Sequence, residues 1–178
     1  MKLSLRASSY QKFLVFAGVL YLLAYLVYQF VVRKYTYYDQ KFIGQIIQGA
    51  DFVLNLLHYK TFKVLQDRDF QVIGIDGSNG VWVGSNCNAI TLFMLFSVVI
   101  IAYPGQQKAK FWFIPAGILA IHILNILRVV ALAIISLKAP DYLDFNHTYT
   151  FTFLIYGFIF SLWMLWINRF SNAKQKQE

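Results

Sequence analysis

Residues 13–32 form an uncharged, strongly apolar run that ends before Arg33 and Lys34. A helix of this length rises about 30 Å, the thickness of the hydrocarbon core of a bilayer. A cleaved signal peptide would have a shorter apolar core and a cleavage site of small residues, and the run shows neither. The run therefore predicts a retained transmembrane helix.

Three further apolar runs predict spans over residues 87–103, 111–137 and 148–167. Hydrophobic residues make up 58% of the chain, whereas soluble domains hold about 45–50%. Pro115 is expected in the first turns of its span, where the ring is tolerated. The sequence predicts an all-α polytopic membrane protein with about four transmembrane helices, forming one domain over residues 1–178.

The segment between the first two spans has two different periodicities. Residues 38–59 place apolar side chains at helical spacing among polar ones, which predicts an amphipathic helix on the membrane surface or packed on the bundle. His58 at its end is expected to be interfacial. Residues 61–65, 70–75 and 81–83 are rich in β-branched and aromatic side chains and are separated by turn residues, so a small extracytoplasmic β-meander is expected.

Basic residues indicate how the chain is oriented. Residues 1–12, 104–110 and 168–178 hold eight lysines and arginines, while seven are spread over the longer segments 33–86 and 138–146. The positive-inside rule then places both termini in the cytoplasm and residues 33–86 outside the inner membrane. The net charge of +8 has this topological explanation, so the lipid bilayer is the expected partner and nucleic acid is not.

Cys87 is the only cysteine, and it lies where a polar segment gives way to an apolar run. It cannot form an internal disulfide, and the sequence has no zinc spacing or phosphate loop, so no metal or cofactor is expected. A lone cysteine is commonly a small buried hydrophobe. A thiol at a helix N-terminus, however, is favoured as thiolate. Asn86 and Asn88 flank it as supporting polar residues.

The predicted topology brings three reactive side chains to one membrane depth on the outer side: Cys87, Arg128 and His147. An arginine inside a span costs a few kcal/mol unless it has a partner. Asn125 shares a helix face with Arg128 and can help to orient it. Alternatively, Arg128 and Asn125 join helices, and His147 is an exposed residue of a first turn. His122, deeper in the same span, is expected to be a helix-packing histidine.

Together the three side chains suit acyl transfer through a thioester. Cys87 would be the nucleophile, and His147 would protonate the leaving amine and then deprotonate the incoming nucleophile. Arg128 would stabilise either the thiolate or the oxyanion, and the sequence leaves that choice open.

Cys87-Asn88-Ala89 at the start of one span, Asn125-Ile126-Leu127-Arg128-Val129 in the next and His147 before the last resemble the exosortase/archaeosortase family. The resemblance covers roughly residues 80–168 and is closest to the short, XrtF-like exosortase variants. It implies a cysteine protease or transpeptidase with Cys87 as nucleophile and Arg128 and His147 as the other catalytic residues. Its substrate would be the C-terminal region of an exported protein, made of a short motif, a transmembrane helix and a basic cluster.

Three other functions remain open at this stage. A non-catalytic membrane assembly or binding protein would use the cysteine, arginine and histidine as structural groups. A transporter or channel subunit would use Arg128 as an anion site, but the chain shows no inverted repeat. A thiol redox sensor would lack a resolving cysteine.

Overall fold

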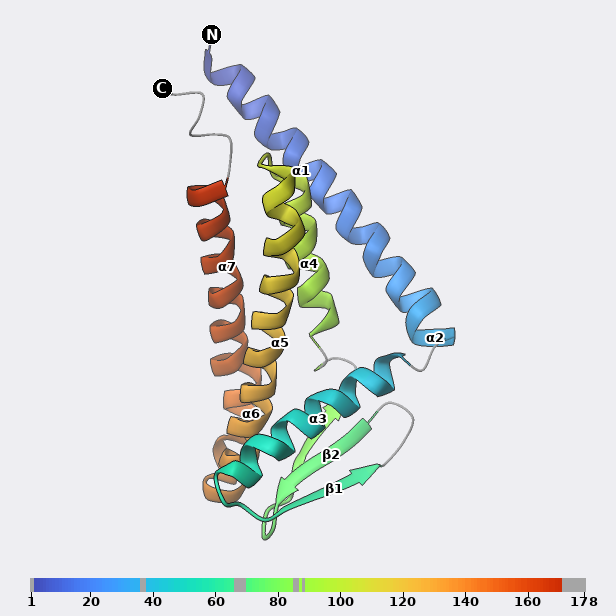
Figure 1. Cartoon of the computed structure of the whole chain (residues 1–178), viewed down its shortest axis with the longest axis vertical. Coiled ribbons are helices and arrows are strands. Elements are labelled where there is room, and N and C mark those ends of the chain that lie inside the picture. The colour runs from blue at the N-terminus through green and yellow to red at the C-terminus, as the bar shows by residue number, and fades with distance from the viewer. Residues whose placement is uncertain (1, 36–37, 66–69, 85–86, 88, 171–178) are drawn as a thin grey trace.

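The computed structural model describes residues 2–35, 38–65, 70–84, 87 and 89–170, and it is mostly helical with one small sheet (Figure 1). The first long helix is α1 (Lys2–Val27), which continues through the π-helix η1 (Tyr28–Val32) into α2 (Arg33–Tyr35). The other elements in chain order are α3 (Tyr38–Leu56), β1 (Thr61–Leu65), β2 (Phe70–Ile75), β3 (Val81–Gly84), α4 (Ile90–Ala102), α5 (Gln107–Lys138), η3 (Pro140–Tyr142), α6 (Leu143–Phe145), η4 (Asn146–Thr150) and α7 (Phe151–Phe170).

The long helices form a bundle, and α3 and the sheet lie across one end of it (Figure 1). Helices α4, α5 and α7 pack against one another, and α1 packs on α4. The start of α1 and the end of α7 lie at the opposite end of the bundle from the sheet. The aromatic and aliphatic core between α4, α5 and α7 includes Phe96, Ile121 and Trp166.

Among the described residues, three helical segments are long and apolar enough to cross a membrane: Gln11–Val32, Gln107–Lys138 and Pro140–Phe170. The predicted second span is shorter than expected. Helix α4 has 13 residues, which corresponds to about 20 Å. It begins at Ile90 rather than at 87 because Ala89 has a left-handed backbone conformation (φ 61°), which an α-helix cannot continue through.

Two further predicted helix boundaries, at the start of α5 and before the last span, were wrong. Helix α5 begins at Gln107, so Pro115 lies inside it rather than in its first turn. The nitrogen of Pro115 carries no hydrogen, so it donates no bond to the carbonyl four residues earlier. Transmembrane helices tolerate the loss of such a bond. The predicted loop before the last span is helical from Pro140 onward, because proline is well suited to a first helical position. His147 therefore lies about two turns inside the last helical segment instead of at its end.

The amphipathic helix and the three strands are confirmed. The sheet is antiparallel in the order β1-β2-β3. Helix α3 buries an isoleucine-rich face (Ile43, Ile46, Ile47) against the sheet and α5. On α5 the same core contains Val129, Val130, Leu132 and Ala133. The sheet and α3 are thereby fixed beside the half of α5 that carries Asn125 and Arg128.

Candidate active site

Cys87 lies in the short connection between β3 and α4 and is partly exposed. The backbone of Cys87 is held in place because the side-chain amide of Asn125 donates a hydrogen bond to the Cys87 carbonyl oxygen at 2.8 Å. Asn125 is only 1% exposed, and removing a partner from a buried hydrogen bond costs about 1–3 kcal/mol. Immediately downstream, the left-handed Ala89 turns the chain into α4 while its carbonyl accepts the first helical hydrogen bonds.

His147 reaches Cys87 from the last helical segment. Its Nε2 lies 3.6 Å from the Cys87 Sγ, a hydrogen-bond contact across 60 residues of sequence. The histidine is in the π-helix η4 (Asn146–Thr150), whose wider turn shifts the following side chains around the helix axis. Single π-turns inside α-helices are frequent at functional sites. The contact allows the proton to be held by either sulfur or nitrogen.

Arg128 approaches the same histidine from α5. Its Nη2 donates to the His147 carbonyl oxygen at 3.3 Å, and the hydroxyl of Thr152 donates to that oxygen at 3.5 Å. The Nε of Arg128 is buried and has no hydrogen-bond partner among the described residues. A buried guanidinium N–H without a partner is costly, so Arg128 is held here at an energetic cost that packing alone does not explain.

A small polar cavity of about 180 Å³ opens beside these groups. Its polar lining residues are Thr91, Asn125, Arg128, Thr152 and Tyr156, and its apolar ones are Ala89, Leu92 and Ile155. Cys87 and His147 are not among its lining residues, and Asn125, whose amide binds the Cys87 carbonyl oxygen, connects the cavity to the backbone of Cys87. Hydrogen-bond donors in such a cavity can hold the carbonyl oxygen of an acyl group, where negative charge develops during acyl transfer.

The structure thus brings together Cys87, Asn125, Arg128 and His147. Asn86 and Asn88, the expected supporting residues, lie outside the described residues. His122 lies elsewhere, with its ring centroid 5.1 Å from that of Phe42.

Several features of the site were missed by sequence reasoning. Thr152 and Tyr156 line the cavity from α7. Their four-residue spacing puts them on one helix face in an otherwise apolar run, which is a signal the sequence does contain. The left-handed Ala89 and the π-helix around His147 leave no comparable trace in the sequence.

The described residues contain no group of three or more histidine, cysteine, aspartate or glutamate side chains that could hold a metal ion. No family model matches the sequence, and neither a curated protein nor a solved structure does so.

Proposed function

We propose that this protein is a membrane-embedded cysteine transpeptidase or protease that processes C-terminal sorting signals of exported proteins through a thioester. The observation that carries the proposal is the 3.6 Å contact between the Cys87 Sγ and the His147 Nε2. A nucleophile within hydrogen-bond reach of a base, with a third group fixing the base, is the arrangement that covalent acyl transfer requires. Here Arg128 and Thr152 hold the backbone of His147.

In the first step the Cys87 sulfur attacks the carbonyl carbon of the scissile peptide bond, and its proton is held by His147. The tetrahedral intermediate collapses as the C–N bond breaks, and His147 delivers the proton to the leaving amine. The product is a thioester between Cys87 and the new C-terminus of the substrate.

In the second step His147 takes a proton from water or from an acceptor amine, which attacks the thioester carbonyl. The C–S bond breaks, and the sulfur leaves as the thiolate or recovers the proton from His147. Water gives hydrolysis and an amine gives transpeptidation. In both steps the guanidinium of Arg128, which lines the polar cavity, would stabilise the oxyanion.

The proposed topology has four spans, with α4 as a short second crossing and the site facing the periplasm. An even number of crossings agrees with the start of α1 and the end of α7 lying at one end of the bundle (Figure 1). In this topology the chain after Ala102 would complete the crossing that the 13 residues of α4 begin. Helix α3 and the sheet then cover the outer end of α5, where a substrate motif would bind.

One observation favours the non-catalytic alternative. The amide of Asn125 and the guanidinium of Arg128 both donate to backbone carbonyls, of Cys87 and His147 respectively. Contacts of this kind also join helices in membrane proteins of purely structural function. On that alternative, Arg128→Ala lowers the yield of folded protein while Cys87→Ser has no effect.

The test is co-expression with an exported reporter whose C-terminus carries a motif, a transmembrane helix and a basic cluster. We expect the wild type to shorten the reporter, and Cys87→Ala and His147→Gln each to reduce processing by at least about 10³-fold. His58→Gln is the matched histidine control, because His58 is exposed at the end of α3. Processing by Cys87→Ala at the wild-type rate would refute the proposal.

A further inference from the structure

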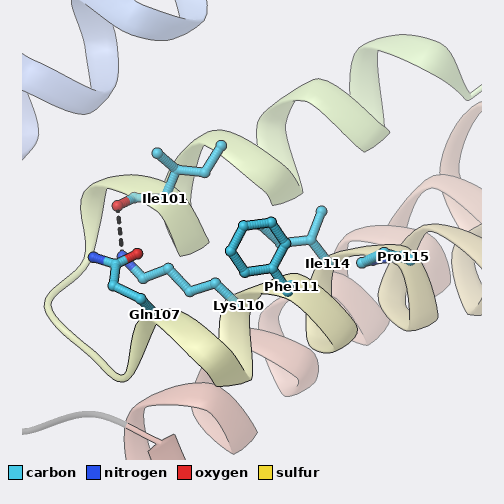
Figure 2. Close-up of a pocket in the computed structure, with 6 residues that line it drawn as sticks. All are labelled: Ile101, Gln107, Lys110, Phe111, Ile114 and Pro115. Carbon is cyan, nitrogen blue, oxygen red and sulfur yellow. Dashed lines mark hydrogen bonds between the residues drawn. The ribbon is translucent and has the colours of Figure 1, made fainter.

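A second and larger cavity lies at the end of the bundle opposite Cys87, between the end of α4 and the start of α5. Its volume is about 430 Å³ (Figure 2). It is lined by Ile101, Gln107, Lys110, Phe111, Ile114 and Pro115. The polar side chains of Gln107 and Lys110 gather at one end near Ile101, and Phe111, Ile114 and Pro115 line the other end.

Lys110 is the charged group of this cavity. Its residue is only 9% exposed, and its Nζ donates to the Ile101 carbonyl oxygen at 2.8 Å. An ammonium has three donors, so this contact leaves two for another partner. No carboxylate of the described residues forms an ion pair with it, and the one described ion pair joins Lys63 and Asp51. A buried ammonium of this kind calls for an anion.

The position of the cavity along α5 fits the surface of a membrane that the proposed topology would place there. Lys110 precedes Arg128 by 18 residues on the same helix, which places them about 27 Å apart along α5. Phe111 and Trp112 beside the cavity are 83% and 54% exposed, as expected for aromatic side chains at a bilayer interface. Lys108 is exposed on the preceding turn, so the region is basic where anionic headgroups lie.

We propose that this cavity binds one anionic phospholipid. Its phosphate would accept hydrogen bonds from Lys110 and Gln107, and one acyl chain would lie over Phe111 and Ile114. The polar-to-apolar order of the lining matches the order of headgroup and chain. A basic peptide is disfavoured by the charge of Lys110, and free phosphate would leave the apolar end unfilled. The proposal is independent of the chemistry at Cys87.

The experiment uses the full-length protein, purified in detergent and delipidated. Native mass spectrometry measures the retention of dioleoyl phosphatidylglycerol, with dioleoyl phosphatidylcholine as the zwitterionic probe. We expect one phosphatidylglycerol to bind roughly tenfold more tightly than phosphatidylcholine, and Lys110→Met to remove that preference. Lys108→Met, which loses the same charge from an exposed position, should keep it.

Phe111→Ala tests the apolar end without changing any charge, and it remains informative if Lys110→Met does not fold. It should weaken phosphatidylglycerol binding severalfold, whereas Phe153→Ala, on the comparably exposed Phe153 of α7, should not. Equal retention by Lys110→Met and wild type, or by Phe111→Ala and Phe153→Ala, would overturn the proposal. So would complete competition by millimolar inorganic phosphate, which would identify a free-anion site.

Discussion

At the end of α3, His58 has a left-handed backbone conformation with φ of 64°. Its N–H donates to the Asn55 carbonyl at 2.9 Å, and the N–H of Tyr59 donates to the Leu54 carbonyl at 3.0 Å. These two bonds close the helix by the Schellman pattern, in which the left-handed position is usually glycine. A residue with a Cβ costs about 1–2 kcal/mol in this conformation. Residue type at this position therefore affects stability without affecting any packed contact.

We expect His58→Gly to raise the free energy of unfolding by about 0.5–1 kcal/mol, because the backbone strain is relieved while glycine costs some unfolded-state entropy. Thermal unfolding in detergent should show a midpoint about 1–4 °C higher. His58→Ala is the control: it keeps the Cβ and should leave the midpoint close to that of the wild type. A lower midpoint for His58→Gly would show that the histidine side chain contributes more than its backbone strain costs.

Where α4 and α5 pack together, Gly117 of α5 faces the ring of Phe96 of α4 and leaves no room for a side chain. A Cβ placed on Gly117 would overlap the ring of Phe96, which is fully buried between the two helices. Small residues at helix crossings allow such close packing in membrane proteins. This contact holds α4 in place along α5, and the chain before α4 carries Cys87.

Gly117→Ala should therefore destabilise the bundle by about 1–3 kcal/mol, because the ring of Phe96 must move. Gly157→Ala on α7 is the matched control, since no atom lies within 4 Å of a Cβ at that position. Thermal unfolding should separate the two variants, with Gly157→Ala unchanged or slightly stabilised by better helix propensity. Equal midpoints would mean that α4 and α5 can move apart at no cost.

Between α3 and the sheet, Asp51 accepts hydrogen bonds from Thr61, Lys63 and Asn55. Burial alone would raise the pKa of the Asp51 carboxyl, but the bonds from Lys63 and Thr61 outweigh burial and lower the pKa below its usual value. The folded-state pKa is thus lower than the unfolded one. The carboxylate therefore stabilises the fold above about pH 4, and this stabilisation is lost as the pH falls through the folded pKa.

We expect Asp51→Asn to unfold at a lower temperature than the wild type at pH 7, by a small margin because Lys63 is half exposed. The difference between the two midpoints should stay constant from pH 7 to about pH 5 and shrink below about pH 4. Melting curves of both proteins across this range measure it. A difference that persists unchanged at pH 3 would show that charge is not its origin.

At the scale of the whole molecule, the membrane topology depends on whether the short α4 crosses the bilayer. If it does, the sheet and the loop after α4 lie on opposite sides of the membrane. In a Cys87→Ala background, we expect Asn79→Cys beside the β2–β3 turn to react with a membrane-impermeant maleimide in spheroplasts. Lys108→Cys and Arg169→Cys, both at exposed positions, should react only after lysis. Labelling of Lys108→Cys in intact spheroplasts would show that α4 does not cross, and the four-span topology would be wrong.

The sequence alone predicted the elements whose signal lies in contiguous residues. The amphipathic period predicted α3, and the β-branched runs separated by turn residues predicted the strands. The length of the apolar runs predicted the three described helices that are long enough to cross a membrane. These features follow from side-chain chemistry along a short segment, because helical and strand periods are local.

Only the tertiary structure decided the geometry of the candidate site. The distance from the Cys87 Sγ to the His147 Nε2 depends on how α4, α5 and the last helical segment pack, and the two residues are 60 positions apart. The left-handed Ala89 sets the direction in which the chain enters α4, and the π-turn around His147 sets where the histidine lies around its helix. Neither feature follows from a periodicity in the sequence. Residue identity supplied a thiol, a guanidinium and an imidazole. The packing of the helices determined that the thiol meets the imidazole and that the guanidinium meets the backbone of the same histidine.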